Sequence, residues 1–280
     1  MEFLKEKAFF VGIDSDGTAF DSMKIKHTFS FIPAAIQVFG LEDCEEVFRE
    51  IEERINLYSL TRGINRFPGL LMTFEELKAA GYGTEIQPQD LKAYIESGSP
   101  LSNAGLKDWL AKSPSAFGQK VLQWSELGDG YFEKLTEDIR PYDGVAEAVE
   151  HMRKAADIMV VSAASSKGLE KDWGRAGLTE KVNFIAGQEF GKKAQQLMYA
   201  KEKGFTGERM LMVGDAPGDY EAAKKAGAWF YPIIPGMETE CWEKLREKYF
   251  DLFVSEQYDK DVESALYDEF IRALESGKRS

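Results

Sequence analysis

Residues 9–18 read FFVGIDSDGT, an apolar run that ends in two aspartates placed two positions apart. A short run without polar side chains is typical of a strand that is buried on both faces, as in a parallel sheet. Gly17 permits a sharp turn directly after the run. We therefore expect Asp14 and Asp16 at the carboxyl end of a buried strand, where open α/β sheets place their active sites.

Polar residues follow two later apolar runs in the same way. Residues 159–161 lead to Ser162, and residues 211–214 lead to Asp215 and Asp219. Because parallel strands end at the same edge of a sheet, these side chains are expected to come close to Asp14 and Asp16.

The spacing of apolar residues predicts an α/β core. Strands are predicted at residues 9–13, 158–161, 182–185, 210–213 and 229–231. Helical patterns separate the later strands, at residues 167–176, 194–203 and 220–226, and two more helices follow at 240–249 and 262–274. Such alternation indicates a doubly wound, Rossmann-like parallel sheet with a helical tail. The aromatic and leucine side chains of that tail, Trp242 among them, are interpreted as packing residues.

The segment between the first two strands has a helical pattern throughout. Its amphipathic stretches are residues 29–39, 45–58, 74–80, 91–96, 106–112 and 117–127. Glycine and proline mark the breaks between them, for example at Gly63 and at Pro68-Gly69. We predict an all-helical domain at residues 22–139, inserted into a core formed by residues 1–21 and 140–280.

Composition excludes several classes of protein. The formal net charge of −13 opposes a nucleic-acid surface, because phosphate backbones are bound by clustered lysines and arginines. No apolar run approaches the ~20 residues that cross a bilayer, so a cytoplasmic protein without a membrane partner is expected. Cys44 and Cys241 lie too far apart in the sequence to suggest a disulfide framework or a zinc site.

The polar residues at the strand ends suit phosphoryl transfer. Of two neighbouring carboxylates, one can act as a nucleophile while the other carries a proton. Asp215 and Asp219 add hard oxygen ligands of the kind that Mg²⁺ prefers. Ser162 could donate a hydrogen bond to a phosphoryl oxygen, and a lysine of the pair at 192–193 could offset negative charge.

Each of these residues also has a structural interpretation. The first acidic pair could be a turn that caps a helix, and Asp219 could cap the helix predicted to begin at Tyr220. Ser162 could be a turn residue. The two lysines could belong to a solvated helix surface.

Taken together, the four motifs resemble those of the haloacid dehalogenase-like hydrolase superfamily. The matching residues are the DSDGT run at 14–18, then Ser162, Lys193 and the GDAPGD run at 214–219. The resemblance covers residues 7–20 and 140–235. Many relatives carry a proline after the third-motif lysine, whereas Ala194 follows Lys193 here, so the choice between Lys192 and Lys193 rests on register.

The resemblance implies a role for each residue. Asp14 would attack phosphorus to form an aspartyl-phosphate, and Asp16 would protonate the leaving oxygen and later activate water. Ser162 and Lys193 would hold the phosphoryl group. Mg²⁺ would be bound by Asp14, the backbone carbonyl of Asp16, and Asp215, with Asp219 as a direct or water-mediated ligand. The helical insert would be a mobile cap that selects the substrate.

Within the insert, residues 61–68 form an unusually basic stretch in an acidic protein. Arg62, Asn65 and Arg66 are candidate substrate-binding residues, which could clamp an anionic or polyhydroxylated leaving group. Alternatively, the two arginines pair with glutamates of the insert.

The function that we expect is a Mg²⁺-dependent phosphomonoesterase acting on a small phosphorylated metabolite. Asp16 favours this over dehalogenation, because removal of a halide needs no acid to protonate a leaving group. Two alternatives remain: a sugar phosphomutase of the same superfamily, and a phosphate-sensing or partner-binding module that docks through the tail from Glu238 onward. The sequence predicts neither the substrate nor the oligomeric state.

Overall fold

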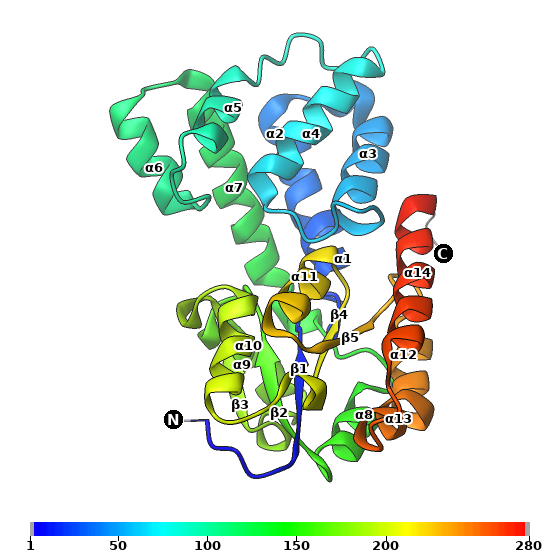
Figure 1. Ribbon diagram of the computed structural model, residues 1–280. Coiled ribbons are helices and arrows are strands. Elements are labelled where there is room, and N and C mark those ends of the chain that lie inside the picture. Colours follow the sequence, from blue (N-terminus) through cyan, green and yellow to red (C-terminus); the bar gives the residue numbers. More distant parts are fainter. Residues whose placement is uncertain (1–2, 278–280) are drawn as a thin grey trace. The chain divides into compact units, whose positions relative to one another are not determined.

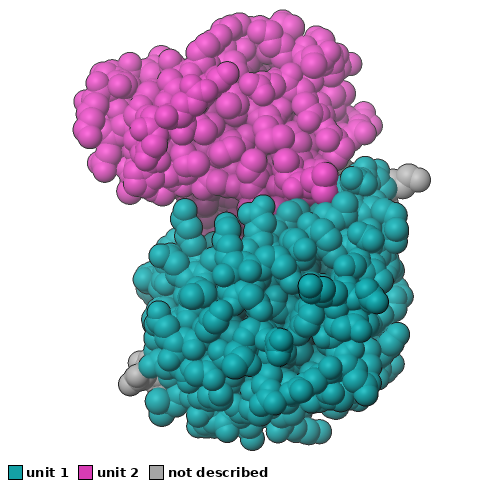
Figure 2. All heavy atoms as spheres, viewed as in Figure 1, with its two compact units in different colours: residues 1–22, 139–280 teal, residues 23–138 magenta. Residues whose placement is uncertain are grey.

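The computed structural model describes residues 3–277, and the chain divides into two compact units (Figure 2). Unit 1 comprises the residues up to Ser22 together with those from Ile139 on. Unit 2 is Met23–Asp138. Among the described residues, no helix is long and apolar enough to cross a membrane. Cys44 and Cys241 are free thiols.

Unit 1 is built on a parallel sheet of five strands in the order β3-β2-β1-β4-β5. The strands are β1 (Phe9–Ile13), β2 (Ala156–Val161), β3 (Phe184–Ala186), β4 (Met210–Gly214) and β5 (Trp229–Pro232). Each lies within two residues of its predicted bounds, and helices flank the sheet (Figure 1), so the α/β prediction is confirmed. The central strand β1 pairs with both β2 and β4.

Helices connect the strands. They are α8 (Val145–Met152), α9 (Ser166–Arg175), α10 (Lys193–Glu202) and α11 (Pro217–Ala226). Helix α10 packs against α11, whereas α8 packs against α12 (Glu238–Lys244), the first helix of the C-terminal tail. Two further helices, α13 (Phe250–Val254) and α14 (Lys260–Ser276), complete the tail.

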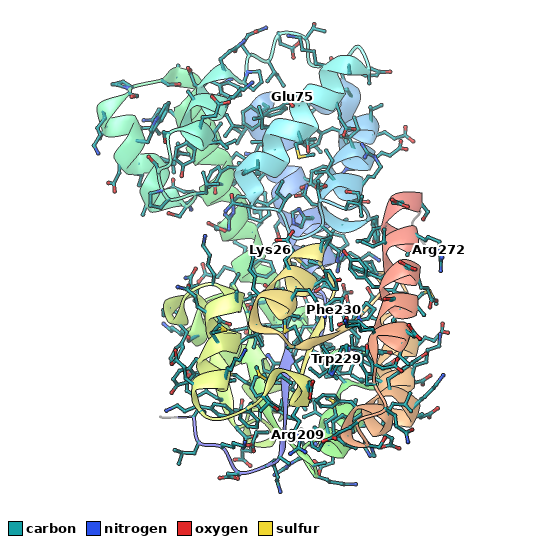
Figure 3. All side chains as sticks on the ribbon, in the orientation of Figure 1. Lys26, Glu75, Arg209, Trp229, Phe230 and Arg272 are labelled. Atoms are coloured by element: carbon teal, nitrogen blue, oxygen red, sulfur yellow. The ribbon has the colours of Figure 1, made fainter. Side chains whose placement is uncertain are left out.

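The tail covers the outer edge of β5, which would otherwise expose unpaired backbone groups. Glu263 of α14 accepts a hydrogen bond from Phe230 N–H at 2.7 Å, and Tyr258 donates to the Phe230 carbonyl at 2.6 Å. The Lys224 ammonium lies 2.6 Å from the Glu263 carboxylate and balances its charge. Figure 3 shows Trp229 and Phe230 beside α14. The edge strand is thus bonded through side chains rather than through another strand.

Unit 2 is helical, as its sequence pattern predicts. Its helices are α1 (Ser22–Lys26, whose first residue belongs to unit 1), α2 (Ile32–Phe39), α3 (Glu45–Leu57), α4 (Arg66–Ala79), α5 (Gln89–Glu96), α6 (Asn103–Lys112) and α7 (Ala116–Leu135). Aromatic rings fill its core, where Phe31 packs against Trp124 and Phe67 against Tyr94.

The predicted break at Pro68-Gly69 is wrong, because both residues lie in the first turn of α4. Proline is tolerated there, since the N–H groups of a first helical turn have no partner within the helix. Gly69 is set by packing, because a Cβ atom at this position would lie 2.6 Å from the Asn56 side-chain oxygen. The glycine therefore marks a close approach of two helices rather than a turn.

We predict that Glu263→Ala lowers the free energy of unfolding by about 2 kcal/mol, since it leaves a buried N–H of β5 without its acceptor. Asp268→Ala on the exposed face of the same helix is the matched control and should change stability by less than about 0.5 kcal/mol. Urea titration followed by circular dichroism measures both. Equal midpoints for the two variants would contradict the role of Glu263.

Candidate active site

The residues after β1 form a closed turn that fixes Asp14. Asp14 N–H donates to the Val213 carbonyl at 3.0 Å, which extends the β1–β4 ladder by one residue. The Ser15 carbonyl accepts hydrogen bonds from Ala19 and Phe20, each at 3.0 Å, and Gly17 adopts the left-handed φ of 78° that the turn requires. We call residues 14–20 the β1 turn.

Three buried carboxylates meet at the ends of β1 and β4. Asp14, Asp215 and Asp219 each place one oxygen atom within 4.8 Å of the others. The strand register explains the meeting, because Ile13 pairs with Val213 and both chains leave the sheet at the same level. Asp219 comes from the first turn of α11. The predicted convergence of acids far apart in the sequence is therefore present.

Lys193 lies among these carboxylates. Its Nζ atom is 2.9 Å from Asp14 Oδ2 and 2.6 Å from Asp219 Oδ1. Lys192 is exposed, and its backbone N–H bonds to the Gln195 side chain. Of the two lysines, Lys193 is thus the one that faces the acidic cluster.

The electrostatics of the cluster follow from burial and like charge. Burial raises the pKa of Asp14 well above its usual value, and the neighbouring Asp219 and Asp215 add to this, while Lys193 opposes it. Burial likewise raises the pKa of Asp219. For Lys193, burial would lower the pKa, but Asp14 and Asp219 outweigh it and raise the pKa above its usual value. The lysine is therefore charged at neutral pH, and three acids share this one ammonium group.

Hydrogen bonds orient the other two acids. The Thr18 hydroxyl donates to Asp215 Oδ1. Asp219 Oδ2 accepts from the backbone N–H groups of Asp215 and Ala216 at 3.2 and 3.1 Å, while Oδ1 takes the Lys193 ammonium. Asp219 therefore caps the start of α11 and belongs to the acidic cluster, so the two interpretations of this residue are compatible.

Asp16 lies outside the acidic cluster. Its carboxylate is partly exposed and accepts a hydrogen bond from the Ser22 hydroxyl. Among the described residues, the carboxylates that lie close enough together to bind one cation are those of Asp14, Asp215 and Asp219, and the Asp16 carboxylate is not among them. A contribution of the Asp16 backbone carbonyl to metal binding stays a prediction.

Ser162 is buried at the end of β2, the strand next to β1. Its hydroxyl accepts a hydrogen bond from Ala164 N–H at 3.1 Å, and its carbonyl accepts one from the Gln196 amide at 2.9 Å. Gln196 follows Lys193 by three positions in α10, so a single helix carries the lysine and supports Ser162.

Arg62 and Asn65, predicted to bind substrate, make structural contacts within unit 2. Arg62 is buried and donates to the Leu57 carbonyl at 2.6 Å. Asn65 is the N-cap of α4, where its side chain accepts from Phe67 N–H at 3.0 Å.

Arg66 pairs with an aspartate rather than with a glutamate. Its guanidinium lies 2.7 Å from Asp129 Oδ1 and 4.4 Å from the centre of the Phe31 ring. A role of Arg62, Asn65 and Arg66 in substrate binding stays a prediction.

Sequence reasoning assigned no role to Thr18 and did not single out Gln196. Thr18 stands within the quoted motif, and its position four residues after Asp14 is the feature that could have drawn attention to it. For Gln196, the corresponding feature is its place on the same helix face as Leu197 and Ala200, where an apolar residue would be expected.

Part of the chain is similar in sequence to a known protein family. Residues 96–232 match a family model described as haloacid dehalogenase-like hydrolase. No curated protein matches the chain.

Two solved structures share the fold at low identity. A haloacid dehalogenase-like hydrolase family protein from Streptococcus pneumoniae is 10% identical, with a TM-score of 0.53 over 84% of this chain and 90% of that chain. A predicted phosphoglycolate phosphatase from Haemophilus somnus is 16% identical, with a TM-score of 0.52 over 81% of this chain and 85% of that chain. These likenesses concern the fold alone.

We predict that Gly214→Ala lowers the free energy of unfolding by about 1–3 kcal/mol, because the added methyl group must displace Asp219. An alanine Cβ at this position would lie 2.4 Å from Asp219 Cβ. Gly218→Ala is the matched control, since a Cβ there meets nothing within 4 Å, and it should change stability by less than about 0.5 kcal/mol. If both variants melt like the wild type, Asp219 is not held against Gly214.

Proposed function

This chain belongs to the haloacid dehalogenase-like hydrolases, and we propose that it is a Mg²⁺-dependent phosphomonoesterase of a small phosphorylated metabolite. One observation carries the proposal: three buried carboxylates and a lysine meet at the carboxyl ends of β1 and β4. The carboxylates follow β1, follow β4 and lie in the first turn of α11, and the lysine begins α10. A nucleophile, a fixed positive charge and oxygen ligands are the groups that phosphoryl transfer needs.

The donor set fits a divalent cation. Asp14, Asp215 and Asp219 offer hard oxygen atoms at a separation that one ion can bridge, and ionising all three buried acids together is costly without a cation beside them. Mg²⁺ bound by these residues would offset the charge of the phosphoryl oxygens. The raised pKa of Asp14 belongs to the protein without the ion, and a nearby cation favours the ionised carboxylate.

Asp14 is the proposed nucleophile. Its carboxylate oxygen forms a bond to phosphorus while the bond from phosphorus to the leaving oxygen breaks. The hydrogen bond from Asp14 N–H to β4 fixes the backbone of this residue, and the ammonium of Lys193 orients its carboxylate. Lys193 and Ser162 are proposed to hold the transferred phosphoryl group through donated hydrogen bonds.

Asp16 is the proposed acid and base. It gives a proton to the leaving oxygen, and the resulting carboxylate takes a proton from the water that hydrolyses the aspartyl-phosphate. Its place outside the three-carboxylate cluster, with partial exposure and a hydrogen bond from Ser22, suits exchange of protons with substrate and water.

The helical unit 2 is proposed to act as a cap that selects the leaving group. Arg62, Asn65 and Arg66 remain the candidates for this contact, and use of Arg66 would require exchange of its pairing with Asp129. The net charge of −13 favours a small metabolite over a polyanionic substrate.

We predict that the wild type releases inorganic phosphate from 4-nitrophenyl phosphate with Mg²⁺ and loses this activity in excess chelator. Asp14→Asn should reduce the rate by roughly a thousandfold or more, because an amide oxygen is a far weaker nucleophile than a carboxylate. Asp143→Asn, on an exposed loop residue, is the control and should retain full activity.

Unchanged turnover in a folded Asp14→Asn variant would refute the nucleophile. Transfer of phosphate between sugar hydroxyls without release of free phosphate would instead identify a phosphomutase.

We predict that Asp16→Asn separates good leaving groups from poor ones. Loss of the proton donor should slow cleavage of an alkyl phosphate by roughly a hundredfold or more. With 4-nitrophenyl phosphate, whose phenolate leaves unprotonated, rapid mixing should show a burst of about one phenolate per enzyme before slow hydrolysis of the intermediate. An equal loss on both esters, without a burst, would argue that Asp16 is not the acid.

A further inference from the structure

Two indole rings hold the β1 turn from different helices. Trp242 of α12 donates its Nε1–H to the Thr18 carbonyl at 2.9 Å. Trp173 of α9 donates its Nε1–H to the Ser15 hydroxyl at 3.1 Å, and its ring packs edge-on against Phe20. Both tryptophans have 0% of their surface exposed. The turn that carries Asp14 is therefore fixed by side-chain donors in addition to its own backbone hydrogen bonds.

Trp242 belongs to a part of the chain that the family match does not include. The match ends at residue 232, whereas α12 begins at Glu238. The helix is held in place by Tyr231, whose hydroxyl donates to the Cys241 carbonyl at 2.7 Å. It is also held by close packing at Gly144, where a Cβ atom would lie 3.3 Å from Trp242 Cβ. The tail is thus joined firmly to the end of β5 and to the loop before α8.

Thr18 links this indole to the acidic cluster. Its carbonyl accepts from Trp242, and its hydroxyl donates to Asp215 Oδ1. Thr18 has no exposed surface. A shift of the Thr18 backbone therefore moves the hydroxyl that orients Asp215, and with it one of the three carboxylates.

We propose that Trp242 is a positioning residue of the active site, which fixes Asp215 for metal binding through Thr18. The inference rests on the proposed function, since it assigns Asp215 to the metal. It gives the C-terminal tail a task in catalysis, beyond the packing that its apolar pattern indicates. Groups that orient metal ligands without touching the ion are commonly needed for full metal affinity.

The test is Trp242→Phe, which keeps an aromatic ring and removes the N–H donor. Isothermal titration calorimetry should show Mg²⁺ binding weakened about tenfold relative to the wild type. The Mg²⁺ concentration for half-maximal activity should rise by the same factor, while KM for 4-nitrophenyl phosphate at saturating Mg²⁺ changes little. Trp229→Phe is the matched control, because this ring lies on β5 against Tyr258, away from the β1 turn.

A double-variant comparison separates positioning from general stability. Thr18→Val removes the hydroxyl that bonds to Asp215, so Trp242→Phe should weaken Mg²⁺ binding no further in that background. Two independent losses of stability would add instead. If Trp242→Phe does not fold, incorporation of 3-benzothienyl-alanine at position 242 removes the N–H donor with the shape of indole retained, and the same tenfold weakening is expected.

The outcomes are distinguishable. Wild-type affinity for Mg²⁺ in folded Trp242→Phe, or in the benzothienyl variant, would overturn the inference and leave the proposed function intact. Additive effects of Thr18→Val and Trp242→Phe would also overturn it. A wild type that neither binds Mg²⁺ nor releases phosphate would overturn the proposed function and the inference together.

Discussion

The parallel pairing of β1 with β4 is the constraint on which the rest of unit 1 depends. It brings Asp14 and Asp215 out of the sheet at the same level and buries both. Like charges held this close repel each other, and burial strengthens the repulsion. The Lys193 ammonium offsets part of this cost, and the backbone N–H groups of Asp215 and Ala216, just before α11, hold Asp219. The fold thus holds the three carboxylates together although their mutual repulsion is unfavourable, as is common where a site must accept a charged ligand.

The core was predictable because buried parallel strands appear in the sequence as uninterrupted apolar runs. Asp14 and Asp215, which follow two of those runs, could then be brought together by topology alone, whereas Asp16 was expected beside them and its carboxylate lies outside the cluster. The start of α4 and the length of α7 could not be predicted in this way. Gly69 and Gly128 resemble breaks, yet each sits inside a helix where a neighbouring side chain approaches closely, Asn56 in one case and Phe31 in the other. Local patterns carry no record of such contacts.

The same limit applies to the residues that support the site. Thr18, Gln196 and Trp242 act through hydrogen bonds between segments far apart in the sequence, such as the 224 positions that separate Trp242 from Thr18. No periodicity marks such a bond. A tryptophan on the apolar face of an amphipathic tail is correctly interpreted as buried, but only the fold shows what its N–H contacts. Gln196 likewise couples two parts of the site, because the helix that carries Lys193 also bonds the carbonyl of Ser162.

The covered edge of β5 has a consequence for the behaviour of the protein at high concentration. A bare edge strand can pair with the edge of another molecule, and such pairing starts ordered aggregation. Here the Phe230 N–H and carbonyl are already occupied by Glu263 and Tyr258, and the charged carboxylate stands where an incoming strand would have to bond. One acidic side chain on the last helix thereby blocks this edge of the sheet against pairing with a second molecule.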